Sequence, residues 1–391
     1  MGGFHRPGLG GRLAGPLVIL VLAGCARPID ATVSVSASPT ASASLTGPVT
    51  PATSTPSPTP APRPQLPLAA GIHVPAGFTA FVYAYGIYQP TAMAFGPDGR
   101  LYVTSAAGNI SVFAGAGAPA RLLVKGLPPS LGLVWRGDEL FVSVRGSIVE
   151  YRLAKDNLAG GAQVVSGLPG GEHQADNLVM LENGDFLLGL GSTCDRCAEA
   201  DPRSATVLRF YADWTYAGVV VRGSRNPYGL AVQPSTGFAY VTINGEDDLG
   251  NSQPADVLIR VRDGEDAGWP RCWPAYPDGS LHGSCVGVSQ PVAAFAAHSS
   301  ADGIVFYEDA EFGPAYRDNA FVTEWGTYFG TTVGRRVVRV AIHGMGSAEQ
   351  GTVTDFASGF QHPLAITVGP DGGLLVGDYG TGQIIEIFRT G

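Results

Sequence analysis

The chain has 391 residues, a net charge of −9 at neutral pH and only two lysines, Lys125 and Lys155. Because a nucleic-acid surface needs clustered cations, this composition excludes a basic groove for DNA or RNA and favours a small polar substrate. The 55 glycines and 30 prolines favour turns, so they indicate many short strands joined by tight loops.

The N-terminal residues have the pattern of an export signal. Basic residues precede an apolar run over residues 13–22, which is too short to span a bilayer as a stable helix. The run closes on Leu-Ala-Gly-Cys at residues 22–25, which resembles a bacterial lipoprotein box. We therefore predict that residues 1–24 are a signal peptide and that Cys25 becomes the lipidated N-terminus. The alternative is an ordinary signal peptide with an incidental cysteine.

A segment rich in Ser, Thr, Pro and Ala follows over residues 25–68. It has almost no large apolar side chain, so it buries too little surface to offset the entropy of ordering. We predict a disordered tether between the lipid and a domain formed by residues 69–391. The protein is then expected outside the cytoplasm, anchored to the cell membrane.

A sequence motif recurs through the rest of the chain. Residues 89–103 show it most clearly, as a polar residue and proline, a small-apolar run, a Gly-Pro-Asp-Gly turn and an apolar strand, and residues 361–376 repeat it. Weaker copies begin near Leu127, His173, Arg225 and His298. Irregular spacing is typical of four-stranded blades whose loops vary in length. We predict an all-β, six-bladed β-propeller.

Closure of the ring requires the two ends of the domain to meet, because an open blade would leave strand edges unpaired. Residues 78–84 and 383–388 are both strand-like. We expect them to share the last blade.

The start of each repeated motif is expected near the central axis of the propeller. Gln89, His173, Arg225, His298 and His362 stand at such starts, so five blades would direct polar side chains to one central mouth. From the repeat alone, the simpler interpretation is that these side chains solvate the channel of a non-catalytic propeller.

The five cysteines leave four in the domain once Cys25 is assigned to the lipid. The close pair Cys194 and Cys197, and the pair Cys272 and Cys285 around a loop rich in Pro and Gly, favour two local disulfides in an oxidising compartment. The alternative is a four-thiolate zinc site, whose ligands usually come as two knuckles. Only one such knuckle is present.

Several stretches resemble the soluble quinoprotein glucose and sorbosone dehydrogenases. They are HQADNLV at 173–179, RNPYGL at 225–230, NGEDD at 244–248, GWP at 268–270, HSS at 298–300 and FVTEWG at 321–326. The resemblance covers most of the chain after about residue 70. It implies oxidation of a sugar at the anomeric carbon with pyrroloquinoline quinone (PQQ) and Ca²⁺, and transfer of the electrons to a separate acceptor.

The resemblance assigns roles to individual residues. His173 would be the catalytic base, with Asp176 either orienting it or capping a turn. Arg225 and Asn226 would contact the cofactor, since a planar guanidinium and an amide suit paired quinone oxygens. The simpler interpretation of Arg225 is an arginine packed between blades.

The acidic loop at residues 244–248 matches the calcium-binding stretch of the family. Asn244 is predicted near the cofactor, and Gly245 and Glu246 would offer backbone carbonyls to calcium, which prefers oxygen ligands. The alternative is a solvated acidic turn.

Cofactor carboxylates are held in similar enzymes by Arg or Lys near the start of the last blade and in the preceding loop. Here the last-blade position is His362, and the loop that starts at Trp325 carries no cation up to residue 329. We predict that Gln89, His362, Arg335 and Arg336 supply the remaining cofactor contacts.

Two other classes of function stay open. A non-catalytic propeller at the cell surface would bind carbohydrate or protein, and the missing cations favour it. A metal-dependent lactonase on the same fold would use calcium and acidic loops, but it lacks support from His173 and Arg225. No motif for covalent haem, a dinucleotide or a phosphate loop is present in the sequence.

Overall fold

The computed structural model describes residues 66–327, 329 and 332–390. The predicted signal peptide, Cys25 and the tether up to residue 65 lie outside these residues. The regular structure described is almost entirely β, with one short 3₁₀-helix, η1 (Gly346–Ala348). Among the described residues no helix has the length and apolar character needed to cross a membrane.

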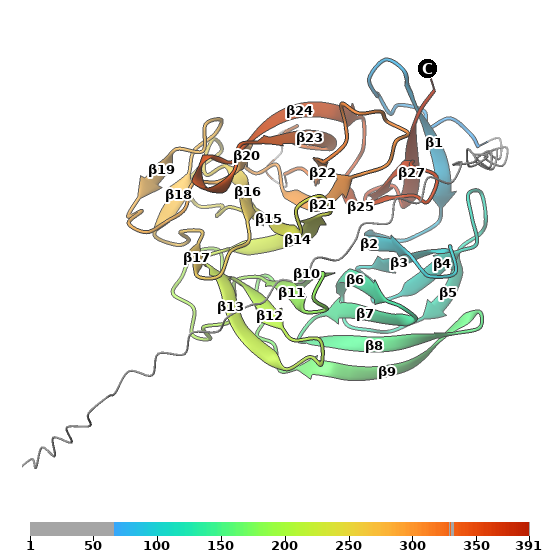
Figure 1. The fold of residues 1–391 in the computed structure, drawn as a ribbon, viewed down its shortest axis with the longest axis horizontal. Helices are drawn as coiled ribbons and strands as arrows, with labels where there is room; N and C mark the ends of the chain where they lie inside the picture. Colours follow the sequence, from blue (N-terminus) through green and yellow to red (C-terminus); the bar gives the residue numbers. More distant parts are fainter. Residues whose placement is uncertain (1–65, 328, 330–331, 391) are drawn as a thin grey trace, which may run out of the picture. The chain divides into compact units, whose positions relative to one another are not determined.

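Six sheets form the blades of a propeller (Figure 1). Blade 1 contains β2 (Pro90–Phe95), β3 (Leu101–Ser105), β4 (Ile110–Phe113) and β5 (Arg121–Val124), and blade 2 contains β6 (Ser130–Arg136), β7 (Glu139–Val144), β8 (Ser147–Ala154) and β9 (Asn157–Ser166). Blade 3 contains β10 (Ala175–Met180), β11 (Phe186–Leu190), β12 (Thr206–Phe210), β13 (Tyr216–Arg222) and the short β17 (Glu265–Asp266). Blade 4 contains β14 (Asn226–Gln233), β15 (Phe238–Asn244), β16 (Asp256–Arg260) and β20 (Ala293–Phe295). Blade 5 contains β21 (Ala301–Tyr307), β22 (Asn319–Glu324), β23 (Arg336–His343) and β24 (Gln350–Ser358).

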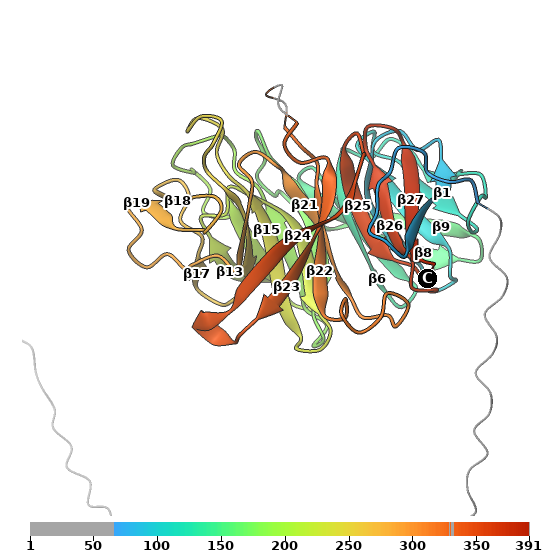
Figure 2. The ribbon, with the colours of Figure 1, turned by 90° about the horizontal axis from the view of Figure 1, so that it is seen from above.

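Blade 6 joins the two ends of the domain. It contains β25 (Pro363–Val368), β26 (Leu374–Asp378), β27 (Gln383–Arg389) and β1 (Phe78–Tyr85), which lie side by side in this order (Figure 2). The inner strands β2, β6, β10, β14, β21 and β25 contact one another in cyclic order, with β25 against β2. The predicted six-bladed propeller and its closure by the chain ends are therefore confirmed.

Each inner strand carries an irregularity near its start. The register breaks occur between Pro90 and Ala92, Ser130 and Gly132, Ala175 and Leu178, Pro227 and Leu230, Ala301 and Ile304, and Pro363 and Ala365. A bulge redirects a side chain and disrupts the ladder locally. Six bulges at equivalent places therefore shape the part of the propeller where the blades converge.

Glycines allow neighbouring inner strands to approach closely just after these bulges. A Cβ atom at Gly229 would lie 2.0 Å from the carbonyl oxygen of Asp302, and one at Gly303 would lie 2.2 Å from that of Leu364. Real side chains do not tolerate such distances. The packing of blades 4, 5 and 6 thus depends on residues without a side chain.

Apolar residues between the blades form the core. One cluster joins Tyr307, Phe312 and Phe321 of blade 5 to Leu374 and Ile387 of blade 6, all of them fully buried. A small hairpin of β18 (Cys272–Pro274) and β19 (Leu281–Gly283) is inserted before β20 and lies outside the six blades. The insertion contains the disulfide between Cys272 and Cys285.

Candidate functional site

A cavity of about 430 Å³ lies where the inner strands converge, and residues of all six blades line it. We call it the axial cavity. Six of the residues predicted at the central mouth or in the site contribute to its lining, namely His173, Arg225, Asn226, Asn244, Gly245 and His298. Four acidic residues line it as well, namely Glu172, Asp247, Asp256 and Asp302.

One side of the axial cavity is apolar. Tyr228, Trp325 and Leu364 pack together there, with Leu131 and Tyr379 against them. An apolar wall opposite several polar groups is the usual composition of a site for a small organic ligand.

His173 is held in one orientation by Ser192. Its Nδ1 lies 2.9 Å from Ser192 Oγ, and that hydroxyl donates its one proton to the carbonyl oxygen of Cys194 at 2.6 Å. Ser192 therefore accepts a hydrogen bond from Nδ1–H, which leaves the lone pair of the neutral imidazole on Nε2. Burial, followed by the charge of Arg225, lowers the pKa of His173 from 6.5 to about 4. The imidazole is thus unprotonated at neutral pH, as a base must be.

Arg225 is nearly buried and paired with acidic groups. Its Nη2 donates to Asp195 Oδ1 at 2.6 Å and to Asp247 Oδ2 at 3.0 Å, and its Nε donates to the carbonyl oxygen of Asp195 at 3.2 Å. The guanidinium is therefore hydrogen-bonded to protein groups, as the simpler interpretation predicted. Arg225 also lines the axial cavity, so it keeps a face toward any ligand there.

The two asparagines of the site carry buried amide oxygens. Asn244 Nδ2 donates to Asp302 Oδ1 at 2.8 Å. The Oδ1 atoms of Asn226 and Asn244 are buried, and no described residue donates a hydrogen bond to either. Such atoms carry a desolvation cost that a donor or a cation would relieve.

Carboxylates hold the backbone amides around the predicted calcium ligands. Gly245 N donates to Asp256 Oδ1 at 2.9 Å, and Asp247 N donates to Asp195 Oδ1 at 2.8 Å. Within the described residues no donor bonds the carbonyl oxygens of Gly245 or Glu246. Gly245 lines both the axial cavity and a small cavity of about 30 Å³, whereas Glu246 lines only the small one. Burial raises the pKa of Glu246 to about 7, although Arg196 lies 3.6 Å away.

Gln89 and His362 lie in a neighbouring cleft instead of the axial cavity. The cleft has a volume of about 470 Å³ and shares Trp325 and Tyr379 with the axial cavity. The His362 ring stacks on Trp325 with a centroid distance of 3.8 Å, and its Nδ1 lies 3.0 Å from the Trp325 carbonyl oxygen. The single central mouth predicted from the repeat is therefore divided by these aromatic side chains.

Arg335 and Arg336 line neither the axial cavity nor the neighbouring cleft. Arg336 pairs with the fully buried Glu324 at 2.7 Å and with Asp355 at 2.8 Å. Arg335 is exposed and precedes strand β23. Their predicted contacts with a cofactor stay predictions without geometric support.

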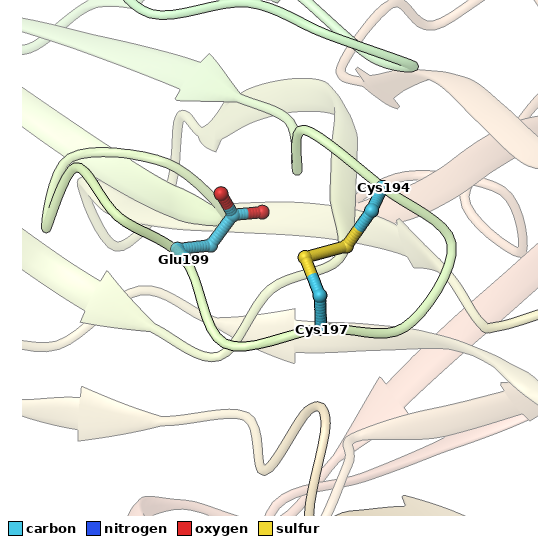
Figure 3. Close-up of side chains that lie close together, drawn as sticks. All are labelled: Cys194, Cys197 and Glu199. Atoms are coloured by element: carbon cyan, nitrogen blue, oxygen red, sulfur yellow. A yellow bond between two sulfur atoms is a disulfide. The ribbon is translucent and has the colours of Figure 1, made fainter. Parts of the chain in front are cut away.

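Both predicted disulfides are present. Cys194 is bonded to Cys197, and Cys272 to Cys285. Among the described residues one group of three potential metal ligands lies close together, namely Cys194, Cys197 and Glu199 (Figure 3). Because the two sulfurs are bonded to each other, they are not thiolates for zinc. Glu199 instead accepts hydrogen bonds from the amide and hydroxyl of Thr193, at 2.7 and 2.6 Å.

Several site residues were missed in the sequence, including Ser192, Asp195 and Asp302. Ser192, and not Asp176, hydrogen bonds the imidazole of His173. The one usable signal for Ser192 and Asp195 was their position around Cys194, because a short disulfide loop fixes the side chains next to it. Asp302 follows the HSS stretch. An acidic residue at the start of an inner strand could have indicated a side chain that faces the central axis.

No family model and no curated protein sequence matches the chain. Solved structures do match its fold. A calcium structure of the family AA12 carbohydrate-active enzyme of Trichoderma reesei has 17% identity and a TM-score of 0.70, covering 84% of this chain and 98% of that one. The holo PQQ domain of pyranose dehydrogenase from Coprinopsis cinerea has 16% identity and a TM-score of 0.71, with the same coverage. PQQ-bound aldose sugar dehydrogenase from Streptomyces coelicolor has 20% identity and a TM-score of 0.62, covering 81% and 99%. At these identities the similarity establishes the fold.

Proposed function

We propose that the protein is a dehydrogenase that oxidises an aldose at its anomeric carbon to the lactone, with PQQ and Ca²⁺ as cofactors and a separate electron acceptor. The observation that carries this proposal is the His173 imidazole, which Ser192 fixes with Nε2 unprotonated in the same cavity as Arg225 and Asn226. The similar folds described as PQQ-bound or calcium-bound enzymes support it. On the resemblance of residues 22–25 to a lipoprotein box, we also propose that Cys25 anchors the protein to the membrane outside the cytoplasm.

The residues present fit calcium and the quinone end of PQQ. The carbonyl oxygens of Gly245 and Glu246 accept no hydrogen bond from described residues and would be available to calcium, which prefers oxygen ligands. Arg225 and Asn226 would hold the quinone oxygens. When bound, PQQ would supply the two-electron acceptor for a hydride from the sugar.

His173 would be the proton acceptor of the reaction. Its Nε2 would take the proton of the anomeric hydroxyl as the C–O bond becomes a carbonyl, and the hydride of the C–H bond would go to the bound two-electron acceptor. The guanidinium of Arg225, which would hold the quinone oxygens, also lowers the pKa of His173. The apolar wall around Trp325 would pack on the less polar face of the sugar and restrict water.

A second function is favoured by the charge of the site. Arg225 is already paired with Asp195 and Asp247, and four acidic residues line the axial cavity. Residues 325–329 carry no cation for the carboxylates of PQQ, and Arg335 and Arg336 line neither the axial cavity nor the neighbouring cleft. A non-catalytic propeller that binds an uncharged carbohydrate at the cell surface would have the same features.

Reconstitution separates the two functions. The purified protein is incubated with PQQ and CaCl₂, and reduction of a dye is measured with a panel of aldoses. His173→Ala should lower the rate by roughly two to four orders of magnitude without loss of PQQ binding. His343→Ala, which changes an exposed histidine at the end of β23, is the matched control and should retain full activity. Sugar binding without turnover in the wild type would support the non-catalytic propeller instead.

A further inference from the structure

The bulges of blades 3 and 5 place two buried carboxyl groups at equivalent positions. Residues 175–178 read Ala-Asp-Asn-Leu and residues 301–304 read Ala-Asp-Gly-Ile, and each stretch spans the bulge of its inner strand. Asp302 lines the axial cavity, as do the bulge residues Thr91, Leu131 and Leu364 of other blades. Asp176 occupies the corresponding bulge of β10 and is buried, and it is not among the residues that line the axial cavity.

These carboxyl groups have no cationic partner in the described residues. Asp176 is 2% exposed and Asp302 5% exposed, and no ion pair within the described part of the chain reaches either of them. Asp176 Oδ2 is buried, and no described donor bonds it. Asp302 receives one hydrogen bond, from Asn244 Nδ2. An isolated buried carboxylate is unfavourable by several kcal/mol, so the pair must hold either protons or a cation.

The pKa values of the two carboxyl groups also show that both cannot be ionised without a compensating cation. Burial raises the pKa of Asp176 well above its usual value, and the charge of Asp302 raises it further. The pKa of Asp302 is also raised by burial and by the charge of Asp256, against the hydrogen bond from Asn244. The two groups are thus close enough to repel each other, and a cation between them would relieve both the repulsion and the desolvation.

The oxygen ligands available at this position favour a divalent cation. Two carboxylates balance a divalent ion, and the buried Oδ1 of Asn244, which has no described partner, adds a third hard oxygen next to Asp302. Calcium takes six to eight oxygen ligands in flexible geometry, so water from the axial cavity would complete its shell. We propose that Asp176 and Asp302, with Asn244 Oδ1, bind a calcium ion at the buried side of the axial cavity. This side-chain site is separate from the predicted backbone site at Gly245 and Glu246 and does not depend on PQQ.

Thermal unfolding tests the proposal. The protein, first dialysed against EDTA and then freed of it, is unfolded with and without CaCl₂, for the wild type and for Asp176→Asn/Asp302→Asn. Calcium at about 100 times its Kd should raise the Tm of the wild type by roughly 5 °C. The double variant should lose most of this shift and, without calcium, should be at least as stable as the wild type, because neutral amides replace desolvated acids.

Two further measurements complete the test. Asp263→Asn is the control, since it changes an exposed acid that does not line the axial cavity; its calcium-dependent shift should persist. Calorimetric titration with CaCl₂ of the wild type and of Asp176→Asn alone should show one binding event fewer in the variant, even if the double variant folds poorly. An undiminished calcium response in the double variant would overturn the proposal. A wild type whose Tm does not respond to calcium would also overturn it, and would show that the pair holds protons.

Discussion

Asp195 holds the guanidinium of Arg225 with both its side chain and its backbone. Nη2 of Arg225 lies 2.6 Å from Asp195 Oδ1, and Nε lies 3.2 Å from the Asp195 carbonyl oxygen. The same carbonyl accepts the indole N–H of Trp269 at 3.1 Å, and the same carboxylate accepts the amide of Asp247. A loop of blade 3 therefore fixes the arginine and the acidic loop of blade 4.

Replacing Asp195 should loosen this arrangement. Asp195→Ala leaves a nearly buried Arg225 with Asp247 as its remaining close partner, and we expect a loss of about 1–3 kcal/mol in the free energy of unfolding. Urea unfolding measures it. Asp248→Ala removes an exposed acid of the same loop as Asp247 and should change the stability by less than about 0.5 kcal/mol. Equal stability of the two variants would contradict the role of Asp195.

The disulfides predict the thiol content of the domain. The folded domain should contain no free thiol, and alkylation should add mass only after reduction. By the loop-entropy account, loss of the Cys194–Cys197 bridge should cost about 2 kcal/mol and loss of the Cys272–Cys285 bridge about 3 kcal/mol. Unfolding of Cys194→Ser/Cys197→Ser and Cys272→Ser/Cys285→Ser measures these losses. Stoichiometric zinc in the purified protein would contradict the disulfides.

The repeat made the blades predictable because its signals are local. A Gly-Pro-Asp-Gly turn between two apolar runs specifies a hairpin, whatever the rest of the chain does. The contact between Asp195 and Arg225 could not be predicted in this way, since it joins loops of two blades and depends on where the Cys194–Cys197 loop lies. Gln89 and His362 show that a correctly predicted position in the repeat does not fix which cavity a side chain lines. They stand at the expected starts of blades 1 and 6, yet the stack of Trp325 on His362 separates them from the axial cavity.

The pH dependence of turnover should report the His173 environment. Because the base must be unprotonated and its pKa is lowered to about 4, the rate should be constant above about pH 5 and fall as the pH decreases through 4. Arg225→Gln removes a positive charge that lowers this pKa, so the acidic limb of the profile should move to higher pH. Arg317→Gln, at an exposed arginine, should leave the profile unchanged. A wild-type limb near pH 6.5 would indicate a solvated base.

Lipidation at Cys25 predicts membrane association. The wild-type protein should sediment with membranes and be released by detergent, because a lipid with a second anchoring signal, or a lipid of several chains, binds membranes stably. Cys25→Ser should appear in the soluble extracytoplasmic fraction. Wild-type protein found entirely in the culture medium would contradict the anchor.

The neighbouring cleft gives a direct test of PQQ as the cofactor. If His362 stands where a PQQ carboxylate binds, a permanent positive charge at this position should strengthen binding. His362→Arg should therefore bind PQQ more tightly than the wild type. The structure favours this substitution as a probe, because His362 lines the cleft that shares Trp325 and Tyr379 with the axial cavity. Fluorescence titration of both proteins with PQQ in CaCl₂ measures the two affinities. Absence of binding in both proteins would exclude PQQ and leave the carbohydrate-binding propeller as the function that the axial cavity supports.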